Sequence, residues 1–110
     1  MSIMSWNCRG LRTPWVVQAL KKAIRKGDPN LVFLMETKLI GSEMKKLQEE
    51  VGLLQGLFVP SVGRKGGLAL LWKFDIQVEL RSLNQWFIDV FVNSGGELVR
   101  EINTLGSFLK

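Results

Sequence analysis

The fold is decided by the stretch LVFLMETK at residues 31–38 of this 110-residue chain. Its first five residues are apolar without alternation, which predicts a short strand buried on both faces. Glu36 follows directly, so an ionisable carboxylate lies at the carboxyl end of that strand. In an open α/β sheet, ligands collect at that end of the strands.

A helix is predicted before this strand, over residues 14–27. Thr13 supplies an N-cap hydroxyl and Pro14 suits the first turn. Apolar residues recur at helical spacing at positions 16, 17, 20, 23 and 24, and Gly27 followed by Asp28 and Pro29 ends the helix. A strand at residues 2–7 precedes it, so strand, helix and strand form a βαβ unit with parallel strands.

The pattern changes after the unit. A second helix is predicted over residues 42–51, followed by strands at 57–59, 68–72, 76–80 and 86–92, the last two from alternating apolar residues. Residues 97–110 fit a weak helix or a frayed tail. The chain therefore passes from a βαβ start to an antiparallel meander.

Composition narrows the class of protein. The chain is 46% hydrophobic and 23% charged, as in one globular domain, and its net charge of +5 favours a polyanionic partner. It has no histidine, which excludes Ser-His and Cys-His dyads and histidine metal sites. A single cysteine, Cys8, favours a buried thiol in a reducing compartment. With no signal peptide and no apolar run of membrane length, we expect an intracellular protein, nuclear or cytoplasmic, without a membrane partner.

Asn7 and Glu36 are the candidate site residues. Each lies at the carboxyl end of a predicted parallel strand, so both should project at one edge of the sheet. Magnesium suits such a pair, because it takes oxygen ligands and keeps waters for substrate phosphates. From spacing alone, a solvated glutamate and an asparagine capping a turn remain the alternative.

Three motifs carry a family resemblance: WNCRGL at 6–11, LVFLMETK at 31–38 and GGLALLW at 66–72, in that order. They resemble the endonuclease domain of plant LINE-type retrotransposons, within the endonuclease/exonuclease/phosphatase superfamily. The resemblance covers residues 1–92, the N-terminal half of such a domain, and leaves 93–110 as a divergent tail. It implies one half of an αββα sandwich, with a mixed sheet and two helices.

The resemblance also implies roles for residues. Asn7 would help to hold the metal and the scissile phosphate, and Glu36 would bind Mg²⁺ directly, which makes both catalytic. Gly66 and Gly67 would let a loop turn sharply beside the cleft, and Met35 stands where relatives often have glutamine. DNA would be the partner.

The loop at residues 63–67 has two readings from its residues alone. Backbone amides with Arg64 and Lys65 would cradle a phosphate and bind substrate together with Gly66 and Gly67. A plain hairpin turn is equally compatible.

The family pattern continues with a tyrosine, an Asp-x-Asn motif and an Asp-His pair, whereas this chain has no tyrosine and no histidine. Relatives are magnesium-dependent hydrolases, but we expect this chain alone to bind Mg²⁺ weakly or not at all and to be catalytically incompetent. The alternatives are a non-catalytic nucleic-acid-binding module, using the basic helix face and the 63–67 loop, and a decayed retrotransposon fragment. A half domain should also leave its inner sheet face bare, with residues 68–71 and 90–92 exposed, and self-associate there.

Overall fold

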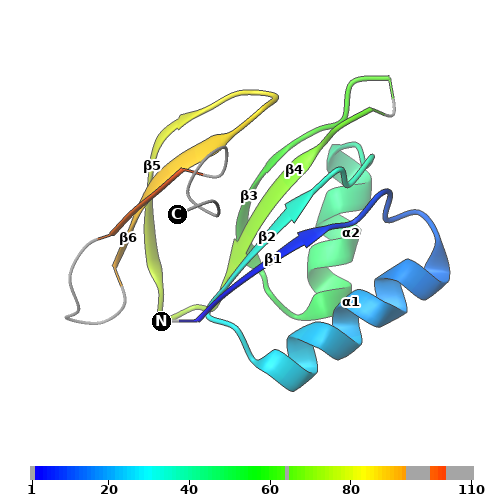
Figure 1. Ribbon diagram of the computed structural model, residues 1–110, viewed down its shortest axis with the longest axis horizontal. Coiled ribbons are helices and arrows are strands. Elements are labelled where there is room, and N and C mark those ends of the chain that lie inside the picture. The colour runs from blue at the N-terminus through cyan, green and yellow to red at the C-terminus, as the bar shows by residue number, and fades with distance from the viewer. Residues whose placement is uncertain (1, 64, 94–99, 104–110) are drawn as a thin grey trace.

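The computed structural model describes residues 2–63, 65–93 and 100–103 of the chain. These residues form three layers (Figure 1): two helices, a four-stranded sheet and a three-stranded sheet. The expected α/β class, with a mixed sheet and two helices, is confirmed. In chain order the elements are β1 (Ile3–Asn7), α1 (Pro14–Gly27), β2 (Leu31–Met35), α2 (Gly41–Val51), β3 (Gln55–Val59), β4 (Leu68–Trp72), β5 (Gln77–Leu83), β6 (Ile88–Asn93) and β7 (Arg100–Asn103).

The four-stranded sheet has the order β1-β2-β4-β3. β1 and β2 are parallel, as the βαβ reading predicts, and β4 is antiparallel to both β2 and β3. Asn7 pairs with Met35, and Met35 pairs with Leu68. The ends of β1 and β2 and the start of β4 therefore meet at one edge of the sheet, which we call the strand-end edge.

Local signals account for the helix boundaries. α1 follows Thr13, whose side chain makes no capping hydrogen bond, and ends before Asp28, which has φ 46° and donates its N–H to the Ile24 carbonyl at 2.8 Å. α2 begins after Ile40, whose N–H is accepted by Glu43 Oε1 at 3.0 Å. Neither helix, within the described residues, is long and apolar enough to cross a membrane.

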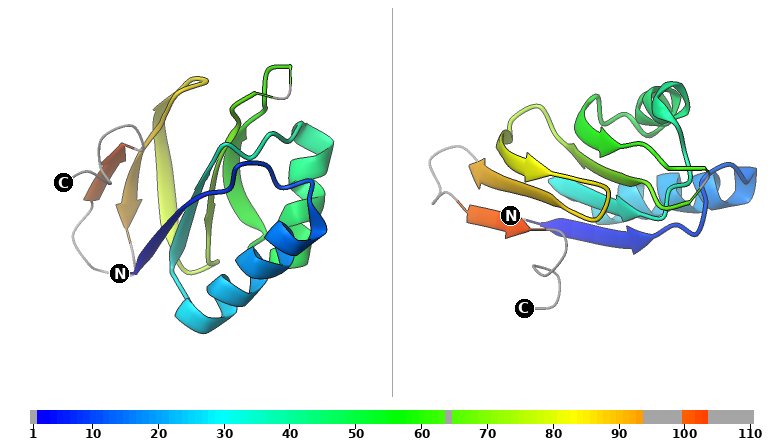
Figure 2. Two further views of the ribbon diagram at one scale, coloured as in Figure 1. Left: turned by 45° about the vertical axis from the view of Figure 1, so that its right-hand side comes forward. Right: turned by 90° about the horizontal axis from the view of Figure 1, so that it is seen from above.

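The central strands β2 and β4 are buried on both faces because their alternate residues enter different cores. One face packs against the helices and the other against the three-stranded sheet β5-β6-β7, as Figure 2 shows from two further sides. The helix-side core includes Leu20, Val32, Leu34, Met44, Leu47, Ala69 and Leu71. The core between the sheets includes Leu31, Phe33, Leu68, Leu70, Ile88, Val90 and Val92.

The prediction of a bare inner face is therefore wrong. Leu70 and Val90, which it expected to be exposed, are both 0% exposed. After β4 the chain reverses within a short turn, in which the Ile76 N–H donates to the Lys73 carbonyl at 3.1 Å, and β5 returns across the sheet face. Self-association through an uncovered sheet loses its physical basis.

Two further expectations change near the C-terminus. The helical alternative fails for Arg100–Asn103, which form β7 and pair with β6; the remainder of residues 94–110 lies outside the described part. The last alternating strand begins at Ile88 rather than Trp86. Asn84 Oδ1 accepts the Trp86 N–H at 2.8 Å in a tight turn, which leaves Trp86 66% exposed.

Candidate metal site at the strand-end edge

Asn7 and Glu36 lie on neighbouring strands at the strand-end edge. Asn7 is the last residue of β1, and Glu36 directly follows the last residue of β2. The ladder continues past both strands, since the Cys8 N–H donates to the Met35 carbonyl at 2.9 Å and the Gly10 N–H to the Glu36 carbonyl at 2.8 Å. The two candidate ligands thus come from adjacent, hydrogen-bonded segments, and both side chains are exposed.

Glu36 occupies an unusual backbone conformation. Its φ is 52°, and that of Lys38 is 57°, in the left-handed region that costs a residue with a Cβ about 1–2 kcal/mol. Neighbouring segments hold this turn on both sides: the Leu11 N–H donates to the Thr37 carbonyl at 2.9 Å, and the Lys38 N–H to the Gly66 carbonyl at 2.8 Å. The surrounding structure therefore fixes where Glu36 stands.

The glycine pair before β4 makes this close approach of segments possible. Gly67 is buried, has φ 95°, and accepts the Thr37 N–H on its carbonyl oxygen at 3.2 Å. A Cβ at Gly67 would collide with Thr37 Oγ1 and stand 3.2 Å from the Lys38 nitrogen. Because Gly67 has no side chain, the chain can pass directly against the turn that carries Glu36.

Asn7 is oriented by its own loop. Its Oδ1 accepts the backbone N–H of Arg9 at 3.3 Å, and Arg9 itself has φ 50°. A carboxamide oxygen has two lone pairs, so this bond leaves one acceptor direction for another ligand.

Cys8 lies beneath the pair as a buried thiol. Burial, and next the negative charge of Glu36, raise the pKa of Cys8 from 9.0 to about 12, against an opposing hydrogen bond from the Met35 backbone. The thiol is therefore protonated at neutral pH and is no nucleophile, which agrees with its reading as a structural residue.

The side-chain oxygen atoms of Glu36 and Asn7 are of the type that binds hard cations. Glu36 offers a carboxylate and Asn7 a carboxamide oxygen, which are the ligands that Mg²⁺ takes while keeping waters. In the described part of the chain, no group of three or more histidine, cysteine, aspartate or glutamate side chains comes together. By the chemistry of their oxygen atoms, Asn7 and Glu36 fit a magnesium ion held by few protein ligands.

Of the remaining predicted site residues, Lys65, Gly66 and Gly67 lie between β3 and β4. The N–H groups of Val62 and Lys65 each donate to the other's carbonyl, at 2.9 and 3.0 Å, so a hydrogen-bonded hairpin turn is present. Lys65 and Gly66 are exposed in it, and Arg64 lies outside the described residues. Gly66 and Gly67 direct their carbonyls, not their amides, at the Glu36–Lys38 turn.

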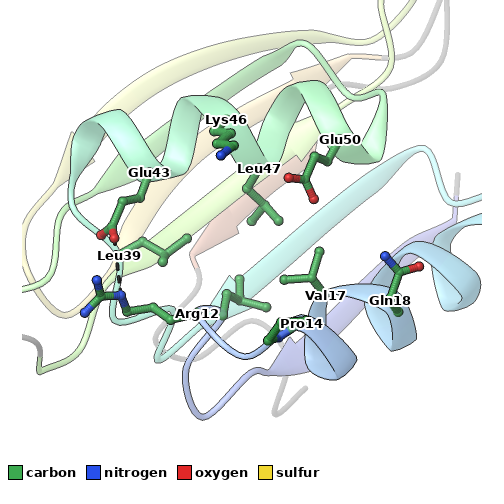
Figure 3. A pocket seen from close by; sticks show the side chains of 10 residues that line it. Arg12, Pro14, Val17, Gln18, Leu39, Glu43, Lys46, Leu47 and Glu50 are labelled. Carbon is green, nitrogen blue, oxygen red and sulfur yellow. Dashed lines mark ion pairs between the residues drawn. The ribbon is translucent and has the colours of Figure 1, made fainter.

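A hollow of about 560 Å³ lies elsewhere, between α1 and α2 (Figure 3). An ion pair between Arg12 Nε and Glu43 Oε2, 3.2 Å apart, closes one end. Neither Asn7 nor Glu36 lines this hollow. The hollow between the helices and the predicted metal ligands therefore lie in different parts of the protein.

Thr37 belongs to the motif at residues 31–38, but no role was predicted for it from the sequence. Thr37 is 1% exposed, the one polar residue so buried among those described. A threonine between two charged residues gives no sequence signal of burial, because its hydroxyl and methyl groups suit either environment.

Comparisons with known proteins agree with this architecture. The model of the endonuclease/exonuclease/phosphatase family matches residues 4–102. The crystal structure of the AP endonuclease LMAP from Leishmania major is similar in fold, with a TM-score of 0.66, 16% sequence identity and 93% of this chain covered. The chain spans 38% of the length of that protein. No curated protein matches the sequence. Because the family match runs through nearly all of β1 to β7, the chain belongs to the endonuclease/exonuclease/phosphatase family.

Proposed function

We propose that the chain provides the metal-holding part of a magnesium-dependent phosphodiesterase site that acts on nucleic acid. The observation that carries the proposal is the pairing of β1 with β2, which brings Asn7 and the exposed Glu36 to one edge. In this proposal both residues bind the ion and are catalytic. When bound, Mg²⁺ supplies charge stabilisation to a phosphate that shares it.

Nucleic acid, and DNA in particular, is the proposed substrate class. The net charge of +5 favours a polyanion. The similar solved structure is, by its own description, an AP endonuclease. The three motifs around Asn7, Glu36 and Gly67 resemble plant LINE-type endonucleases, which makes DNA the preferred polyanion. In this proposal Arg64 and Lys65 contact substrate phosphates, with Gly66 and Gly67 shaping the turn.

Turnover by the 110 residues alone should be negligible. Phosphodiester cleavage needs an activated nucleophile and charge stabilisation besides a metal. The chain has no histidine and no tyrosine for the roles that relatives give them, and Cys8 stays protonated. Glu36 and Asn7 would hold an ion and a phosphate without completing the reaction. The buried free thiol fits a reducing, intracellular location.

A plasmid-nicking assay with Mg²⁺, together with a Mg²⁺ titration followed by backbone amide shifts, tests the proposal. We expect no nicking above the level of Glu36→Ala, and weak but saturable shifts near Asn7 and Glu36 that Glu36→Gln abolishes. Glu49→Gln, an exposed change on α2, is the matched control and should leave the shifts intact. Robust nicking that Glu36→Ala removes would disprove the proposed incompetence, and shifts that survive Glu36→Gln would disprove the metal site.

A second candidate, a non-catalytic nucleic-acid-binding module, rests on the basic face of α1. The position of this face limits where nucleic acid could bind, since the second half of α1 carries Lys21, Lys22, Arg25 and Lys26. That half ends near the start of β2 and away from the strand-end edge (Figure 1). Salt-dependent oligonucleotide binding that Lys22→Gln with Lys26→Gln removes, and Glu36→Gln leaves unchanged, would favour this candidate. Affinity that is indifferent to salt would remove it.

A further inference from the structure

We infer that Thr37 is a positioning residue, whose buried hydroxyl holds Glu36 in its left-handed conformation at the strand-end edge. The inference rests on the proposed function of Glu36 as a metal ligand and extends it to a residue that touches neither metal nor substrate. Three observations support it: the backbone conformation of Glu36, the main-chain bonds of Thr37 and the contacts of its side chain.

The first is the conformation that has to be held. Glu36 and Lys38, the neighbours of Thr37, have φ values of 52° and 57°. Such conformations persist only where surrounding contacts over-determine them. A relaxation of Glu36 to extended backbone would turn its side chain away from its present direction, because successive side chains of an extended chain point to opposite faces.

The second is the anchoring of Thr37 by main-chain bonds on both sides. Its carbonyl accepts the Leu11 N–H at 2.9 Å, from the loop that follows β1, and its N–H donates to the Gly67 carbonyl at 3.2 Å, at the start of β4. Thr37 therefore joins the segment of Asn7 to the segment of the glycine pair, with Glu36 between them in the fold.

The third is the side chain itself. Thr37 Oγ1 accepts the N–H of Leu39 at 3.4 Å, a local bond that closes the turn over Lys38. The hydroxyl packs where Gly67 has no side chain, since a Cβ there would overlap Oγ1. The 1% exposure of Thr37 keeps water from replacing this bond. The Thr37 hydroxyl thus holds Leu39 in place, and the main-chain bonds hold Thr37 itself.

The test compares hydroxyl and bulk in the full 110-residue chain. Thr37→Val keeps the branched shape and removes the hydroxyl, whereas Thr37→Ser keeps the hydroxyl and removes a methyl group. The three-bond coupling between amide and α protons of Glu36 depends on φ and reports the conformation without any metal. A Mg²⁺ titration reports the consequence for the ion. Thr13→Val is the matched control, because Thr13 makes no side-chain capping bond.

We expect Thr37→Val to change the Glu36 coupling and to weaken Mg²⁺ binding by at least about tenfold, as loss of a ligand-orienting partner does. Thr37→Ser should keep the wild-type coupling and bind Mg²⁺ within about twofold of the wild type, and Thr13→Val should alter neither. An unchanged Glu36 coupling in Thr37→Val would overturn the inference. If Thr37→Val does not fold, Thr37→Ser and Thr37→Ala decide: serine keeps the coupling, alanine loses it, and equal behaviour contradicts the inference.

The two proposals fail in different ways. If the wild-type chain shows the left-handed coupling at Glu36 but no saturable Mg²⁺ shifts, the metal site fails while the coupling comparison still judges Thr37. If Mg²⁺ binds at Glu36 and Thr37→Val changes nothing, the metal site stands and the positioning role falls.

Discussion

Gly67→Ala is the change whose effect follows most directly from the structure. At φ 95° an alanine meets the left-handed backbone penalty, about 1–2 kcal/mol. Its Cβ would also overlap Thr37 Oγ1 and crowd the Lys38 nitrogen at 3.2 Å, and forcing an extra methyl group into a packed site costs about 1–3 kcal/mol more. The sum is about 2–5 kcal/mol, a large share of the about 5–15 kcal/mol that stabilises a domain.

Gly63→Ala separates the two contributions. Gly63 has φ 57°, so alanine meets the backbone penalty, but nothing lies within 4 Å of its Cβ position. Chemical denaturation of both variants should therefore show Gly67→Ala less stable than Gly63→Ala by about 1–3 kcal/mol. Adding Thr37→Ala should relieve part of the Gly67→Ala cost, because the overlapping oxygen is gone. Stabilities of Gly67→Ala and Gly63→Ala within about 0.5 kcal/mol of each other would refute the reasoning about the close approach.

Two further predictions concern the sandwich and the buried thiol. Ile88→Ala, in the core between the sheets at 0% exposure, should lower the free energy of unfolding by about 2–5 kcal/mol in urea melts. Leu80→Ala, at 43% exposure on β5, should change it by no more than about 0.5 kcal/mol, and equal effects would contradict a covered inner face. The raised pKa of Cys8 means that the folded chain holds this proton more tightly than the unfolded chain between pH 9.0 and about 12. Stability should therefore fall as the pH rises above 9.0, and Cys8→Ala should flatten that fall; an identical slope in the variant would count against the burial of the thiol.

Local elements could be predicted from the sequence because their signals are local. The continuous apolar runs of β2 and β4 are bounded by polar or glycine residues, and both strands have the predicted limits, Leu31–Met35 and Leu68–Trp72. α1 begins at Pro14 as expected, since proline is preorganised for a first turn. The placement of Asn7 and Glu36 at one edge of the sheet followed from the parallel direction of two strands joined by a βαβ crossover.

The packing of one sheet on the other could not be predicted in the same way. Alternation in β6 indicates that one face is buried, but it does not say against which surface. Trp86 continued the alternating pattern, yet Asn84 captures the Trp86 N–H and starts a turn before β6. The burial of Thr37 could not be predicted from the sequence because it depends on Gly67, which is distant in sequence and lies next to Thr37 only through the pairing of β2 with β4.

In the proposed site, Asn7 and Glu36 hold one divalent ion between them. Relaxation of amide protons by substoichiometric Mn²⁺, a paramagnetic stand-in for Mg²⁺, locates that ion directly. We predict strongest broadening for the amides of Cys8, Glu36 and Thr37, and its loss in Glu36→Gln. Broadening centred instead on Glu43 and Glu50, which line the hollow between the helices, and unchanged by Glu36→Gln, would contradict the account.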